Sequence, residues 1–215
     1  MQVNDENFKD VLPDFVKHLV LNISQENFEN FIFPNEVETL EIKNIDFINH
    51  LPKKVNKLIG NYIKSIDTFN LPMLETLILS FRYNSEEINL DFLPCSLKYL
   101  SLKHDGTSPK KYDLTNLPNS LRKLKLENIE FNHLPKNIEF LHLKNLQPNN
   151  HNMNYSNLKK LKIIFCFGFI DCTLTLNNID KVKIIAYGKI STIIHNNVKN
   201  LICNDACSIQ KYLIF

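Results

Sequence analysis

The chain has 215 residues, of which 44% are hydrophobic and 22% charged, and its formal net charge is +2 at pH 7. These values are typical of a soluble globular protein that is long enough to bury a sizeable core. Only four glycines leave little room for Gly-rich phosphate loops, and the most apolar run, Ile163 to Ile170, is too short to span a bilayer. The polar N-terminus lacks the apolar segment of a signal peptide, and an odd number of cysteines (five) does not make a disulfide framework. We therefore expect a cytoplasmic, reduced protein.

One pattern recurs along the chain, and its clearest copies are Leu117 to Leu126 and Leu134 to Leu143. It reads Leu-Pro, two free residues, an aliphatic residue, two free residues, Leu, one free residue, Leu. The final alternation predicts a short half-buried strand, and the proline marks the turn before it. The middle apolar residues of the successive copies are Leu19, Leu40, Leu58, Leu77, Leu100, Leu124, Leu141, Leu161, Val182 and Leu201. They advance by about 20 residues per step, the period of leucine-rich repeats.

Some copies share more than the apolar frame. Asn44 and Asn128 occupy equivalent positions and are followed by Phe47 and Phe131. With these residues, the LPxxLxxLxL phrase resembles the leucine-rich repeat family, and most closely the FNIP-type repeats of amoebae and large amoeba-infecting viruses. The FNIP tetrapeptide itself is absent, and the Leu-Pro pair is lost after Pro135. The resemblance implies one short parallel strand per repeat, stacked into a single curved sheet.

The predicted fold is therefore a leucine-rich repeat solenoid of the α/β horseshoe class, dominated by β-structure, with about ten strands. The convex segments are too short for full helices in most repeats, so we expect turns, extended segments and single helical turns there. The whole of 1–215 is predicted to be one domain, with an N-terminal cap at 1–11, repeats at 12–203, and a C-terminal cap or partial repeat at 204–215. The apolar end of that last segment favours an edge strand and leaves oligomerisation open, although we expect a monomer.

Residues that flank and interrupt each apolar pair should face the concave side of such a solenoid. In the C-terminal half they are mostly lysines, and Glu127 is the only acid among them. Strands about 4.8 Å apart would hold these ammonium groups within one Debye length of each other. The predicted partner-binding residues are Tyr99, Lys103, Lys123, Lys125, Phe140, His142, Lys144, Lys160, Lys162, Lys181 and Lys183.

This face predicts a non-catalytic protein–protein interaction module that binds another protein, an acidic one in particular. One alternative is binding of nucleic acid or acidic lipid by the lysines; nucleic acid is the weaker candidate because Arg82 and Arg122 are the only arginines. Another is a structural or decoy repeat protein without a specific ligand, in which the lysines only solubilise exposed strands. We expect no association with a membrane.

No phosphate loop, nucleophile elbow, HExxH motif or recognisable pair of carboxylates is present, so we predict no enzyme, catalytic residue or cofactor. Cys203, Cys207 and His195 have a spacing loosely like that of a metal site. However, Cys203 fills an apolar slot of the repeat, and the second ligand pair of a zinc signature is missing. We expect it, Cys166 and Cys172 to be core residues rather than metal ligands. His50 and His133 both precede Leu-Pro turns and are interpreted as repeat residues.

Overall fold

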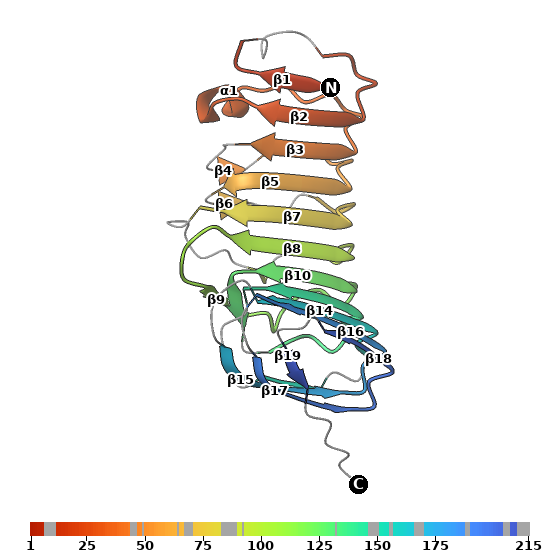
Figure 1. The fold of residues 1–215 in the computed structure, drawn as a ribbon. Coiled ribbons are helices and arrows are strands. Elements are labelled where there is room, and N and C mark those ends of the chain that lie inside the picture. Colours follow the sequence, from red (N-terminus) through yellow and green to blue (C-terminus); the bar gives the residue numbers. More distant parts are fainter. Residues whose placement is uncertain are drawn as a thin grey trace.

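A single long sheet of parallel strands dominates the computed structural model (Figure 1). The structure describes residues 1–6, 12–43, 47–48, 50–63, 65–66, 71–82, 90–91, 93–131, 133–145, 151–154, 157–165, 170–187, 190–203 and 207–209. Within these ranges, eleven strands form the long sheet: β1 (Gln2–Asn4), β2 (His18–Asn22), β3 (Thr39–Lys43), β5 (Lys57–Ile63), β7 (Thr76–Phe81), β8 (Tyr99–His104), β10 (Lys123–Glu127), β12 (Phe140–Lys144), β14 (Lys160–Phe165), β16 (Lys181–Ala186) and β18 (Asn200–Cys203).

The strand register confirms the predicted repeat frame residue by residue. Each middle apolar residue pairs with that of the next repeat, from Leu19 beside Leu40 to Val182 beside Leu201. The strand beyond the predicted ten is β1, which pairs in parallel with β2 and lies inside the segment predicted as the N-terminal cap. The fold is therefore a solenoid of leucine-rich repeats.

The core follows from the alternation within each strand. In β10, the inward Leu124 is 1% exposed, whereas its neighbours Lys123 and Lys125 are exposed and half-buried. Leu141 and Leu161, the equivalent residues of β12 and β14, are each 2% exposed. Burying one such side chain stabilises the fold by about 2 kcal/mol. Because successive residues of a strand point to opposite faces, the same pattern that builds this core also directs the lysines outward.

The convex side is more regular than the sequence predicts. Short parallel strands pair there as β4 (Phe47–Ile48) with β6 (Ser65–Ile66) and as β9 (Lys110–Tyr112) with β11 (Ile129–Phe131). Behind the last repeats lies a four-stranded sheet of β13 (His151–Asn154), β15 (Ile170–Asn177), β17 (Ile190–Asn196) and β19 (Cys207–Ile209). β19, at the edge of this second sheet, lies within the predicted C-terminal segment 204–215; residues 210–215, with the apolar end on which the edge-strand prediction rested, lie outside the described part.

Among the described residues, the one helix is α1 (Gln25–Glu29), close to the N-terminal end of the stack. The Ser24 hydroxyl accepts a hydrogen bond from the backbone N–H of Asn27, which makes Ser24 its N-cap. Asp5 holds the same corner, because its carboxylate accepts hydrogen bonds from the Ser24 N–H at 2.6 Å and the Asn27 amide at 2.7 Å. These contacts hold the pKa of Asp5 below its usual value. These hydrogen bonds tie the turn after β1 to the helix that follows β2.

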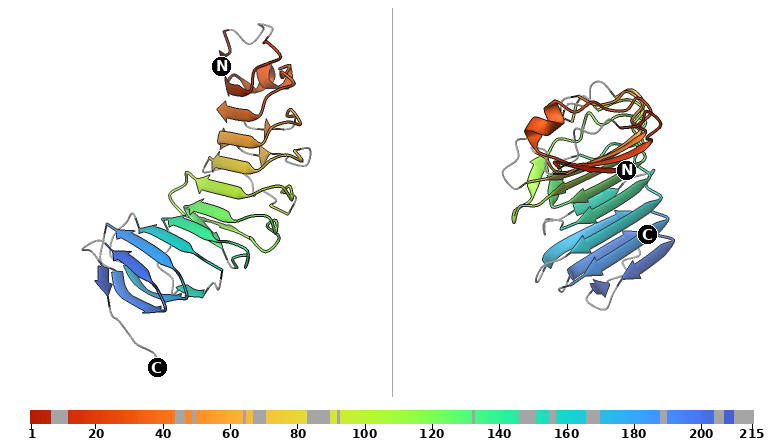
Figure 2. Two further views of the ribbon diagram at one scale, coloured as in Figure 1. Left: turned by 90° about the vertical axis from the view of Figure 1, so that its right-hand side faces the viewer. Right: turned by 90° about the horizontal axis from the view of Figure 1, so that it is seen from above.

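The stack is nearly straight at its N-terminal end and bends over the later repeats (left view of Figure 2). It bends toward the open face of the long sheet, so that face is concave over β10 to β18. The second sheet lies on the opposite, convex side of the same repeats. The outward side chains of β8 to β16 therefore line the inside of the bend.

Candidate partner-binding groove

A groove with a volume of about 570 Å³ lies on the concave face across β7 to β16. Nine of the eleven residues predicted from the sequence line it: Tyr99, Lys123, Lys125, Phe140, His142, Lys160, Lys162, Lys181 and Lys183. Thr76 also lines it, from a position predicted to face the concave side, whereas the sequence did not indicate the lining by Leu124, Leu141 and Leu161. Those leucines are core residues, 1–2% exposed, and border the groove from beneath the lysine rows. The volume is within the range of known ligand sites.

The groove lysines form two rows, because the strands are parallel and in register. Lys160 lies beside Lys181, and Lys162 lies beside Lys183. In the first row, Phe140 lies between Lys123 and Lys160. The ammonium groups of these two lysines are 5.5 and 5.3 Å from the centroid of its ring. Such cation–π contacts offset part of the repulsion between the lysines.

His142 occupies the middle of the second row, between Lys125 and Lys162. Burial and the nearby Lys162 and Lys125 lower its pKa to about 4, with Lys144 adding to the effect and Glu127 opposing it. The imidazole is therefore neutral near pH 7, and the row presents two kinds of polar group: positive ammonium groups and an uncharged ring. Its Nε2 atom is buried and has no hydrogen-bond partner among the described residues.

Within the described part of the chain, the six groove lysines make no ion pair with an acid. The two remaining predicted residues differ. The Lys144 ammonium is 2.6 Å from the Glu127 carboxylate, and that of Lys103 is 2.6 Å from the Asp105 carboxylate. The structure therefore places Lys103 and Lys144 outside the groove, where acids at the strand ends compensate them.

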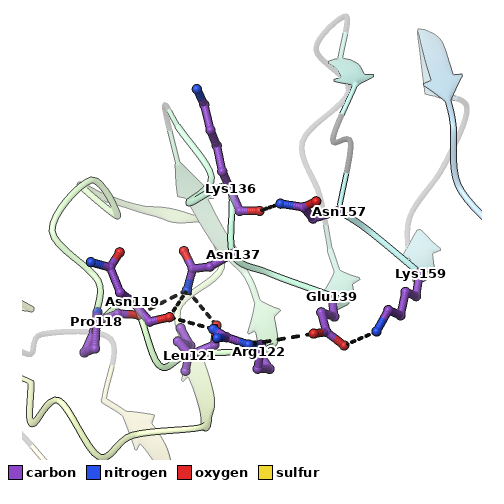
Figure 3. A network of polar contacts seen from close by, with 9 residues as sticks. All are labelled: Pro118, Asn119, Leu121, Arg122, Lys136, Asn137, Glu139, Asn157 and Lys159. Atoms are coloured by element: carbon purple, nitrogen blue, oxygen red, sulfur yellow. Dashed lines mark hydrogen bonds and ion pairs between the residues drawn. The ribbon is translucent and has the colours of Figure 1, made fainter.

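The residues directly before the strands, unlike the groove lysines, mostly pair with groups of opposite charge. Their charges alternate along much of the solenoid, and we call this row the ion-pair ladder. It contains Lys17–Glu38 at 2.8 Å, Glu75–Lys98 at 2.5 Å, Arg122–Glu139 at 3.7 Å, Glu139–Lys159 at 2.8 Å and Asp180–Lys199 at 2.7 Å. Figure 3 shows the part in which Glu139 lies between Arg122 and Lys159. These contacts lower the pKa of the Glu139 carboxyl and raise that of the Lys17 ammonium.

A second structural row uses short polar side chains to hold the turns together. The Asn137 amide donates to the backbone oxygens of Pro118, Asn119 and Leu121, the last at 2.6 Å (Figure 3). Asn157 donates in the same way to the Lys136 carbonyl at 2.7 Å. In the two preceding repeats this position holds Ser96 and Ser120, whose hydroxyls donate to Leu74 and Leu97 carbonyls. The polar hollow of about 540 Å³ beside these side chains is lined by groups that mostly pair with one another, so we assign it no ligand.

The cysteine and histidine interpretations can be followed only in part. Cys203 is half-buried and packs against the core, as predicted. The side chains of Cys207 and His195 are outside the described part, as are that of Cys172 and the whole of Cys166. In the described residues, no three His, Cys, Asp or Glu side chains gather as a metal ion would require.

His50 and His133 differ in their surroundings. The His50 ring contacts Phe28 and Phe33, with centroid separations of 4.9 and 5.7 Å, so it has a packing role between repeats. His133 is exposed in the turn before Leu134. Neither lies in the groove.

No family model and no curated protein matches the sequence. Among solved structures, the chain is similar to CroV588, described as a novel circular leucine-rich repeat protein, at 14% sequence identity and a TM-score of 0.42. The similarity covers 90% of this chain and 47% of that one, so this chain spans about half of its length. The class itself rests on the register and buried leucine pairs: a leucine-rich repeat solenoid, a fold that typically offers a concave binding surface rather than a catalytic site. Among the residues the structure describes, none belongs to a helix capable of crossing a membrane.

Proposed function

We propose that this chain is a non-catalytic protein-interaction module that binds an acidic segment of another protein in the groove over β8 to β16. The segment would lie across the strands, with its carboxylates near the two lysine rows. The partner's chemistry is thus defined by what the groove presents: ammonium groups and aromatic rings.

The observation that carries the proposal is the contrast between neighbouring rows. In the ion-pair ladder, acids compensate most of the lysines, as in Glu139 beside Lys159. One residue further along the chain, Lys160 and Lys181 lie in register, and no acid of the described part pairs with either. Like charges directly opposite in a sheet are destabilising. If the groove lysines served only solubility, we would expect acids beside them as often as beside the lysines of the ion-pair ladder. The lack of such acids in the described part of the groove therefore supports a binding role.

A protein partner is favoured over nucleic acid by the state of the aromatic side chain. Proteins that bind single strands stack bases on open aromatic faces. Phe140 instead has the ammonium groups of Lys123 and Lys160 over its ring. The groove also contains no arginine, the residue best suited to phosphate and base recognition. Arg122 lies in the ion-pair ladder and is engaged with Glu139.

Two finer assignments are part of the same proposal. The interleaved Phe and Asn residues, such as Asn128 before Phe131, support placing these repeats with the FNIP-type leucine-rich repeats. The odd number of cysteines supports a cytoplasmic location, and Cys95 and Cys203 are free thiols.

The proposal is tested with a fluorescent hexaglutamate peptide as the acidic probe, and with hexaglutamine and a single-stranded oligonucleotide as comparisons. Two triple variants are matched: Lys125→Gln, Lys162→Gln and Lys183→Gln in the groove, and Lys98→Gln, Lys159→Gln and Lys199→Gln in the ion-pair ladder. Both sets remove three positive charges, so bulk electrostatics changes equally.

We expect the groove variant to weaken binding of hexaglutamate at least about tenfold, since several charge-assisted contacts are lost together. The ladder variant should stay within about twofold of the unchanged chain. An equal loss in both variants, or no binding by the unchanged chain, contradicts the proposal. Tighter binding of the oligonucleotide, with steep salt dependence, would favour the nucleic-acid alternative instead.

A further inference from the structure

His142 differs from the other groove residues because an imidazole ordinarily titrates close to neutral pH, so its charge is sensitive to what surrounds it. It lies at the centre of the groove on β12, with Lys125 beside it on β10 and Lys162 beside it on β14. The other charged groups that act on it are Glu127 from β10 and Lys144 from its own strand. Lys144 and Glu127 compensate each other at 2.6 Å, so the two flanking lysines dominate the local field.

The Nε2 atom of His142 is buried and makes no hydrogen bond with the described residues. A buried polar atom without a partner costs free energy, and a ligand that supplies a partner recovers it. Lysine side chains are long and flexible, so Lys125 and Lys162 can turn toward an entering anion and expose the ring to it. The position therefore offers three nitrogen donors to one anion: the two ammonium groups and an Nε2–H of the imidazole, to which a second proton would add positive charge.

We propose that His142, Lys125 and Lys162 form an anion subsite that seats one carboxylate of the acidic partner, and that filling it transfers one proton from solvent to His142. The inference rests on the proposed function and adds that binding of the acidic partner depends on pH. In the transfer, an N–H bond forms at the imidazole and an O–H bond of hydronium or a buffer acid breaks, with no other change in bonding. The carboxylate then accepts hydrogen bonds from the imidazolium and the two ammonium groups.

The physical reason is that a bound anion counteracts the positive charges that now keep the His142 ring neutral. In the free groove, burial and two nearby positive charges disfavour the imidazolium, and the pKa is about 4. A bound carboxylate offsets those charges and favours the protonated ring. If the bound ring regains an ordinary pKa of about 6.5, proton linkage predicts about tenfold tighter binding at about pH 5.5 than at about pH 7.5. Glutamate carboxyls stay almost fully ionised over this range, so the probe does not mask the effect.

The experiment measures hexaglutamate affinity at these two pH values and follows the His142 ring by NMR, with sulfate as a second, non-titrating probe. His142→Gln is compared with His18→Gln, a matched exposed histidine on β2 of the same sheet and outside the groove. For the unchanged chain and His18→Gln, we expect hexaglutamate to bind about tenfold more tightly at about pH 5.5 than at about pH 7.5. For His142→Gln, the ratio should fall to within about twofold, because the coupled proton is lost. The His142 resonance should also titrate at a higher pH when the peptide is bound.

The outcomes separate this inference from the proposed function. If the unchanged chain binds hexaglutamate equally at both pH values, the inference is overturned and the proposed function stands. If it binds at neither, the proposed function fails and the subsite with it. A shift of the His142 resonance with sulfate but not with the peptide overturns the carboxylate assignment. Equal pH ratios in His142→Gln and His18→Gln overturn the assignment to this residue.

Discussion

Neutralising Lys125, Lys162 and Lys183 together is expected to make the fold more stable, even though it removes the proposed binding groups. The reason is the register: Lys162 lies directly beside Lys183, and each faces a further lysine two residues away on its own strand. No described acid pairs with any of the three. The chain would therefore hold these charges together at a cost in stability, which selection for function can maintain.

The expected size follows from the strand spacing. Two charges about 5 Å apart in water repel by about 0.8 kcal/mol, and screening at about 0.15 M salt reduces this to about 0.4 kcal/mol. The weaker contacts along each strand and across the groove bring the total for the three lysines to about 1 kcal/mol. At about 1 M salt, where the Debye length is about 3 Å, the gain should nearly vanish.

Urea unfolding followed by circular dichroism at low and high salt measures this effect. The matched ladder variant, with Lys98, Lys159 and Lys199 changed to glutamine, should shift the midpoint the other way, because it breaks ion pairs. A groove variant no more stable than the unchanged chain at low salt would refute the reasoning. So would a stabilisation of equal size in the ladder variant, since the effect would then belong to net charge alone.

Three further predictions concern single residues. Asn137→Ala should lower the free energy of unfolding by about 1 kcal/mol, because the Pro118 carbonyl loses its side-chain donor while those of Asn119 and Leu121 keep Arg122. The exposed Asn119→Ala should change it by less than about 0.5 kcal/mol, and equal effects would contradict the role of the amide. Leu141→Ala, in the core beneath the groove, should cost about 2–5 kcal/mol in the same urea assay, and a near-neutral result would contradict its burial. Because the folded pKa of His142 is about 4, below the usual unfolded value, stability should fall as pH drops from about 6.5 to 4. In His142→Gln this part of the pH profile should flatten, and an unchanged slope there would contradict the assignment.

The long sheet could be predicted from sequence because each repeat carries the same short signals. Proline marks the turn, and alternating leucines such as Leu124 and Leu126 mark the strand and its buried face. Once that face is known, the outward positions follow, and the groove collects nine of the eleven residues assigned to them. The ion-pair ladder occupies the position just before each strand, so the same repeat frame locates its residues. The sequence near each residue does not show, however, whether its charge forms an ion pair.

The remaining features depend on contacts that the repeat pattern does not encode. The convex strand β15 does alternate apolar and polar residues, but β17 does not, and neither follows a Leu-Pro pair of the kind that marks the repeat frame. The position of Lys144 outside the groove depends on its contact with Glu127, a residue 17 positions away. The state of His142 likewise depends on neighbours from three strands.

The ion-pair ladder also constrains how such a gene can gain or lose repeats. Loss of the repeat that carries Glu139 would bring Arg122 and Lys159 into adjacent register, so two cations would meet where an acid now lies between them. Loss of the repeat that carries Asp180 would do the same to Lys159 and Lys199. Units of nearly equal shape therefore differ in the charges that they bring into register, and the ladder tolerates one pair of adjacent cations, Lys98 and Arg122. Duplication would be tolerated best for a pair of neighbouring repeats that already balance each other's charge.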